Sequence, residues 1–152
     1  MGSSKAYAAA EVALTAETVK PKKATDTAIY TIARNSGEGN DRKATKGDFY
    51  LNDVEYANIK LIGETYKNVI VNINSGGIIS TAFFDEINEA TADHYGGAAI
   101  DSLFLMSLAG QEGGNALVEV LHRTGSPSCM LTYSLADIYD YYPAPQHCVC
   151  DF

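Results

Sequence analysis

Carboxylates gather on a glycine-containing segment early in the chain, where they could donate or accept protons. Glu38 stands between Gly37 and Gly39 in the stretch "SGEGNDR", and Asp41 and Asp48 follow within ten residues. Glycine neighbours have no side chains and allow unusual backbone angles, so a ligand can come close to Glu38. A carboxylic acid on a loop that a second surface covers has a raised pKa, which suits proton donation. From these residues alone, however, a solvated loop residue is the better interpretation of Glu38.

The other charged residues of this segment have two interpretations. Asp41 precedes Arg42 and Asp48 follows Gly47, so both aspartates could hold the loop in shape through ion pairs or caps instead of doing chemistry. The cations could form a rim that holds a carboxylate or a polar ligand, or they could simply be solvated. These cations are Arg34, Arg42, Lys43 and Lys46.

The sequence gives little support for a nucleotide-binding site or for a nucleophilic catalytic triad. Gly37 and Gly39 resemble the start of a dinucleotide fingerprint, but Arg42 replaces its third glycine. The chain has no G-x-x-x-x-G-K-[ST] and no G-x-S-x-G motif, and its three histidines have no evident serine or cysteine partner. We therefore expect no cofactor.

Cysteine usage argues against a metal site and against a disulfide framework. The chain has three cysteines, and the "HCVC" stretch at 147–150 lacks a second pair at zinc-finger spacing. We expect no bound metal. So few cysteines fit a reducing cytoplasm without establishing it.

Charge and hydropathy exclude two classes of partner. The formal net charge is −8, and residues 51–152 carry most of the acidic excess, which argues against a nucleic-acid partner. No apolar run approaches the roughly 20 residues of a membrane span, so we expect no membrane partner.

Strand-like and helix-like segments alternate along the chain. Apolar, β-branched stretches predict buried strands at 26–33, at 68–73 and within 98–109, with a weaker strand near 130–133. Helical spacing predicts helices at 52–66, 83–90 and 110–122, and a helix-like stretch within 5–25 ends at Pro21. This order predicts an α/β fold, a flavodoxin-like three-layer sandwich with a mostly parallel sheet and helices on both faces. The glycine-bearing turns then share the sheet edge where such folds bind ligands.

Four motifs occur in a specific order: "SGEGNDRKATKGDFYLNDVE", "NVIVNINSGGII", "GQEGGNALVEVL" and "SPSCMLT". Together they resemble the α/β-sandwich domain of glycoside hydrolase family 3, the β-glucosidase and β-xylosidase family. The resemblance covers residues 14–143, leaving a tag-like or poorly ordered segment at 1–13 and a divergent tail at 144–152. It implies a retaining glycosidase whose aspartate nucleophile lies on a separate (β/α)8-barrel domain.

The resemblance also implies roles for individual residues. In relatives with the S-G-E-G-x-D-R loop the glutamate is the general acid/base, and it maps onto Glu38. Residues that match the rest of the loop pattern are expected to shape it, namely Asp41, Arg42, Gly47 and Asp48. A second loop matches at Gln111, Glu112 and Asn115, with a structural or domain-interface role. The implied partners are the barrel domain and a β-linked glucoside or xyloside, and without the barrel the chain is expected to be inactive.

The C-terminal part departs from the family pattern. Cys129 and Met130 stand where the family has glycine and lysine, and Tyr141 occupies an acidic position in "YDYYP". Two further hypotheses therefore stay open. The chain could be a free-standing carbohydrate-binding or scaffold domain, or it could self-associate through the surface that would face a barrel.

Overall fold

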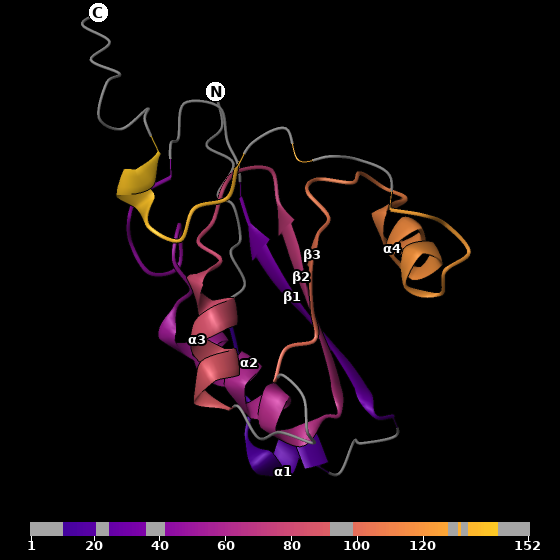
Figure 1. Cartoon of the computed structure of the whole chain (residues 1–152). Helices are drawn as coiled ribbons and strands as arrows, with labels where there is room; N and C mark the ends of the chain where they lie inside the picture. Colours follow the sequence, from indigo (N-terminus) through magenta and orange to yellow (C-terminus); the bar gives the residue numbers. More distant parts are fainter. Residues whose placement is uncertain are drawn as a thin grey trace, which may run out of the picture.

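Three parallel strands form the sheet of this protein. The computed structural model describes residues 11–20, 25–35, 42–91, 99–127, 131 and 134–142. The strands lie in the order β1 (Thr27–Arg34), β2 (Asn68–Ser75) and β3 (Ser102–Leu105), and β1 pairs with β2 along its whole length (Figure 1). The three strands predicted at these places are confirmed. Because they are parallel, their carboxyl ends meet at one edge of the sheet.

Helices lie on both sides of the sheet. The helices α2 (Asp53–Thr65) and α3 (Ala82–Ala90) lie on one side, and α4 (Gly113–Leu121) lies on the other (Figure 1). Two shorter elements complete the order, the four-residue α1 (Ala16–Val19) and the 3-10 turn η2 (Tyr139–Tyr141). The predicted α/β sandwich with a parallel sheet is confirmed.

The main core lies between the sheet and the α2–α3 layer. Alternate residues of β1 and β2 are buried there, and α2 contributes side chains at helical spacing. Gly63 lets α2 approach closely, because a Cβ at this position would lie 3.0 Å from the Ala99 Cβ. The fully buried apolar side chains of this core include Ile32, Ile59, Val69, Val71, Ile73, Ile79, Ile87 and Ile100.

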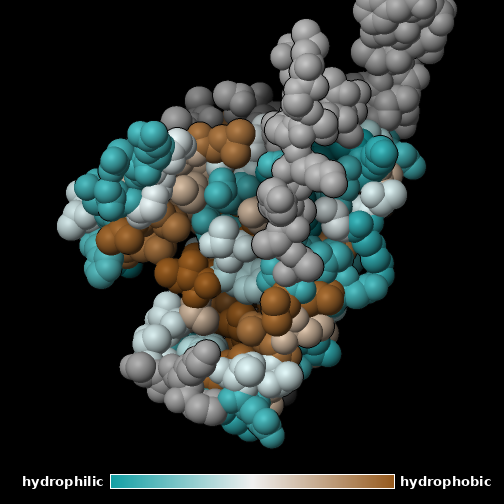
Figure 2. Space-filling model, turned by 180° about the vertical axis from the view of Figure 1, so that it is seen from behind, coloured by the Kyte–Doolittle hydropathy of each residue, from teal (hydrophilic) through white to brown (hydrophobic). Residues whose placement is uncertain are grey.

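The opposite face of the sheet is only partly covered. Ile29 of β1 is 49% exposed on this face, while Asn72 of β2 is buried beside the Met106 sulfur. Seen from behind, apolar residues gather across the middle of the molecule (Figure 2). The helix α4 approaches this face at Met106, since a Cβ on Gly113 would lie 2.6 Å from the Met106 Cε.

The N-terminal helix is shorter than the helix-like stretch in the sequence. Within 11–20 it begins only at Ala16, because the side chain of Asn58 holds the preceding residues extended through bonds to the Leu14 N–H (2.7 Å) and the Val12 carbonyl (2.9 Å). The segment 1–10, most of the weak strand predicted near 130–133 and the tail from 143 onward lie outside the described residues. The predicted domain limits stay predictions. None of the helices within the described ranges is long and apolar enough to cross a membrane.

Candidate active-site loop

The loop that carries Glu38 begins at the carboxyl end of β1. Glu38 and Asp41 themselves lie outside the described residues. The structure does describe both bases of the loop, which are the end of β1 at Arg34 and the returning segment 42–51. The geometry of these two bases determines where the loop starts and where it ends.

The first base is held by a buried ion pair. Arg34 donates from both terminal nitrogens to the two carboxylate oxygens of Glu55, each at 2.6 Å, and the side chains are 7% and 6% exposed. Such a bidentate pair fixes orientation as well as distance. Glu55 is at the same time the third residue of α2 and accepts the N–H of its N-cap, Asn52, at 2.8 Å. The end of β1 is thereby fixed to the start of α2.

The second base is organised around Asp48. Its carboxylate accepts one bond from the Arg42 guanidinium (2.9 Å) and one from the backbone N–H of Lys43 (2.8 Å). The other terminal nitrogen of Arg42 donates to the Ser75 hydroxyl at 2.8 Å, at the carboxyl end of β2. Arg34 also donates to the Asp48 carbonyl at 3.0 Å, so one aspartate connects both bases of the loop.

Burial alone would raise the pKa of Asp48, but the bonds from Lys43 and Arg42 and the positive charges of Arg42 and Arg34 outweigh it and lower the pKa. Asp48 therefore stays ionised at neutral pH. Gly47, just before it, has φ +85°, a left-handed conformation that favours glycine, and its N–H donates to the Tyr50 carbonyl at 2.8 Å. The expected shaping role of Arg42, Gly47 and Asp48 thus has a matching local geometry.

Aromatic side chains pack against the returning segment. Phe49 is 1% exposed and packs edge-to-face against Tyr50, Tyr139 and Tyr142. The Tyr139 hydroxyl donates to the Arg42 carbonyl at 2.7 Å, so η2 contacts the loop base directly. Tyr139 and Tyr142 therefore help to position the base of the loop.

The residues of the second predicted loop lie at the start of α4. Gln111, Glu112 and Asn115 are exposed, and Asn115 donates to the Glu112 carboxylate at 2.6 Å. In the part of the chain that the structure describes, no hydrogen bond or ion pair joins them to Arg34, Arg42 or Asp48. The structure thus brings three of the predicted residues together at the first loop and leaves the second set apart from them.

Three residues of the loop base were not predicted as site residues from the sequence. The sequence around Glu55 resembles a capping box with Asn52 and so indicates only a helix cap, and Ser75 and Tyr139 carry no local signal. One sequence pattern could have indicated the ion pair. It is an arginine at the end of a strand followed by a glutamate at the third position of the next helix. The other two contacts join segments far apart in sequence.

The two arginines at the loop bases each pair with a carboxylate in the described part of the chain. Arg34 pairs with Glu55, and Arg42 pairs with Asp48. Among the described residues no three His, Cys, Asp or Glu side chains form a group that could hold a metal ion.

Comparison with known proteins identifies relatives over almost the whole chain. Residues 4–149 match the family model of the glycosyl hydrolase family 3 C-terminal domain. The chain is 30% identical over 143 residues to β-glucosidase A of Butyrivibrio fibrisolvens, covering 80% of this chain and 16% of the relative. It is 29% identical over 134 residues to a β-glucosidase of Schizophyllum commune, covering 86% of this chain and 65% of the relative.

Solved structures show the same similarity. A β-glucosidase from Paenibacillus barengoltzii superposes with a TM-score of 0.77 at 27% identity, covering 89% of this chain and 14% of that protein. β-Glucosidase 3B from Thermotoga neapolitana in complex with glucose gives a TM-score of 0.71 at 32% identity, covering 84% and 17%. The chain thus spans less than a fifth of the length of these two proteins, and they contain much that it does not match.

Proposed function

This chain belongs to the glycosyl hydrolase family 3 C-terminal domain family, and we propose that its loop 35–42 supplies the general acid/base of a retaining β-glucosidase-like active site. The reacting residue is Glu38. The nucleophile is an aspartate on a (β/α)8 barrel that this chain does not contain, and the substrate is a β-linked glucoside or xyloside. The observation that carries the proposal is the pair of fixed loop bases at Arg34 and Arg42 on either side of Glu38.

The proposed chemistry divides the reaction between two surfaces. A retaining glycosidase needs two carboxyl groups about 5 Å apart, one to attack the sugar and one to protonate the leaving oxygen and then deprotonate water. Docking of the loop against a barrel would remove water from Glu38 and raise its pKa, so that it starts the reaction protonated. Fixed bases keep the acid in place when the second surface closes over it. Asp41 is proposed to shape the same loop, and Gln111, Glu112 and Asn115 to face the domain interface.

The test is a chimera in which this chain replaces the matching domain of the Thermotoga neapolitana enzyme, assayed with aryl glucosides. Glu38→Gln should lower kcat/KM by about 10²- to 10⁴-fold for a poor leaving group, the usual contribution of general acid catalysis. The decrease in the rate of the glycosylation step should be smaller for a good leaving group, because such a group departs without being protonated. Glu64→Gln, on the exposed side of α2, is the matched control and should leave kcat/KM unchanged.

Two results would contradict the proposal. One is a chimera whose activity on the poor leaving group survives Glu38→Gln. The other is turnover by the isolated chain that disappears in the same variant, because one carboxylate would then have found its partner without a barrel.

A further inference from the structure

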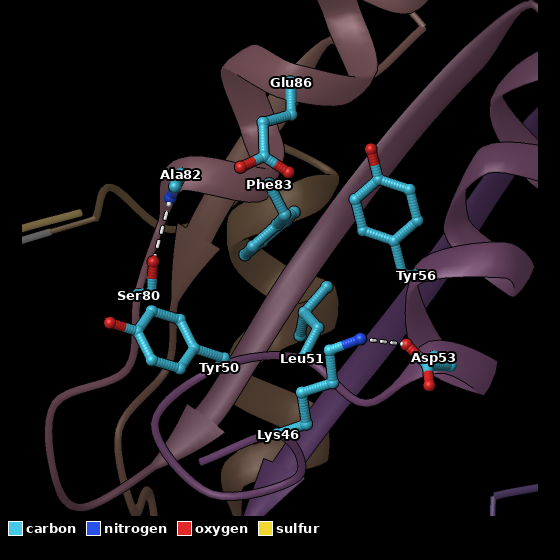
Figure 3. Close-up of a pocket in the computed structure, with 9 residues that line it drawn as sticks. All are labelled: Lys46, Tyr50, Leu51, Asp53, Tyr56, Ser80, Ala82, Phe83 and Glu86. Carbon is cyan, nitrogen blue, oxygen red and sulfur yellow. Dashed lines mark hydrogen bonds and ion pairs between the residues drawn. The ribbon is translucent and has the colours of Figure 1, made fainter. Parts of the chain in front are cut away.

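A pocket opens between the amino-terminal ends of α2 and α3, beside the returning segment. Its volume is about 440 Å³, within the range of roughly 300–1,000 Å³ that is typical of small-molecule sites. The side chains that enclose it come from the segment 46–51, from α2, and from the start of α3 (Figure 3). None of these residues belongs to the catalytic loop proposed above.

The floor of the pocket is apolar. Leu51 and Phe83 form it and are 8% and 4% exposed, so both are anchored in the core. Tyr50 and Tyr56 stand at its sides (Figure 3). Tyr50 is held in place through its hydroxyl, which accepts the Tyr139 N–H at 3.4 Å. A flat ring with an apolar face can lie against such a surface.

The polar groups around the floor are of mixed type. The Lys46 ammonium pairs with Asp53 at one end, while the Glu86 carboxylate and the Tyr56 hydroxyl lie at the other (Figure 3). Within the described part of the chain, Glu86 and the Tyr56 hydroxyl have no hydrogen-bond or ion-pair partner. The pocket therefore offers a charged donor, carboxylate acceptors, and a hydroxyl that can do either.

This set of groups selects among ligand classes. An anion would be repelled by Glu86, whose charge is uncompensated because the Lys46 ammonium already pairs with Asp53. An organic cation could pair with Glu86 but would leave the hydrogen-bonding capacity of the Tyr56 hydroxyl and of the Lys46–Asp53 pair unused. A neutral ring with several hydroxyls satisfies donors and acceptors together, and its C–H face can cover the Leu51–Phe83 floor. We propose that this pocket binds a hexopyranose, at a position separate from the loop that carries Glu38.

The experiment is an NMR titration of the full isotope-labelled chain with glucose, cellobiose, myo-inositol and tetramethylammonium. Glucose or cellobiose should shift the amide signals of the pocket residues. Glu86→Ala should weaken that binding at least about tenfold, and Tyr56→Phe should weaken it by a smaller factor. Glu89→Ala, on an exposed position of the same helix, is the matched control and should bind like the unchanged chain. Far-UV circular dichroism checks that each variant keeps its fold.

Several results would overturn the inference. These are the absence of saturable shifts with either sugar, shifts that persist in Glu86→Ala, binding of myo-inositol alone, and tighter binding of tetramethylammonium than of glucose. Only the choice of glucose and cellobiose as probes rests on the proposed function. Glu38→Gln should leave sugar binding in this pocket unchanged. The catalytic proposal is therefore tested by the kinetic assay of the chimera, and the pocket proposal is tested separately by the NMR titration.

Discussion

Replacing Glu55 by glutamine should destabilise the chain more than a typical surface substitution. Glutamine has nearly the same shape and can still accept the Asn52 N–H, so the helix cap is kept. The Arg34 guanidinium, however, loses the carboxylate charge that it faces and one of its two 2.6 Å bonds, so it remains a buried cation without its counter-ion. Breaking a buried pair by removing one partner costs about 3–5 kcal/mol. Because Arg34 keeps its bonds to the Ala33 and Asp48 carbonyls, we expect a value near the lower end, about 3 kcal/mol.

The measurement is urea unfolding followed by far-UV circular dichroism and tyrosine fluorescence, since the chain has ten tyrosines and no tryptophan. A loss of about 3 kcal/mol lowers the urea midpoint by about 1–2 M when m is near 2 kcal/mol/M. The double variant Arg34→Leu/Glu55→Leu removes both charges and should be clearly more stable than Glu55→Gln, because no buried charge is left unpaired.

The reasoning would be refuted if Glu55→Gln lowered the free energy of unfolding by less than about 1 kcal/mol, the usual value of an exposed ion pair. It would also be refuted if the double variant lost as much stability as the sum of its two single variants, because the two side chains would then act independently.

Three further predictions concern the returning segment of the loop. Gly47→Ala should cost about 1–2 kcal/mol in urea unfolding, because φ +85° strains any residue with a Cβ. Asp48→Asn should make the free energy of unfolding depend less on pH on the acid side. The folded pKa of Asp48 is lowered, so its ionised carboxylate contributes stability above the unfolded pKa, near pH 4. This stability is lost as the pH falls through the folded pKa. Thermal unfolding between pH 2 and 7 checks this, and parallel curves for the two proteins would contradict it. Tyr139→Phe removes the bond to the Arg42 carbonyl and should lower the free energy of unfolding by about 1 kcal/mol, with no change in the midpoint counting against the contact.

The elements of the fold were predictable because their signals are local. β1 and β2 are runs of β-branched and apolar residues, and α2 begins at the capping box that Asn52 and Glu55 form in the sequence. The first helix was predicted too long because helix propensity competes with tertiary contacts. Asn58, more than 40 residues away, binds Leu14 and Val12 in an extended conformation.

The loop base was predictable only in part. That Asp48 could stabilise the loop through an ion pair or a cap was foreseen from its position after Gly47, and its ion-pair partner is Arg42, six residues away. The bonds from Arg34 to Glu55 and from Arg42 to Ser75 span 21 and 33 residues, so they depend on how the strands and helices assemble. Glu55 also shows what a local motif leaves out. The motif indicates that this carboxylate caps a helix, but not that it also pairs with an arginine.

The contact between Tyr139 and the Arg42 carbonyl joins residues 97 positions apart, and it links the loop to the order of synthesis. At roughly 5–20 residues per second, a ribosome makes Tyr139 about 5 to 20 seconds after Arg42. During that interval β1, β2 and α2 can assemble, but the returning segment lacks both this bond and the edge-to-face contacts of Phe49 with Tyr139 and Tyr142. During synthesis, the base of the proposed catalytic loop can therefore reach its final geometry only after Tyr139 and Tyr142 have been made, when β1, β2 and α2 are already available.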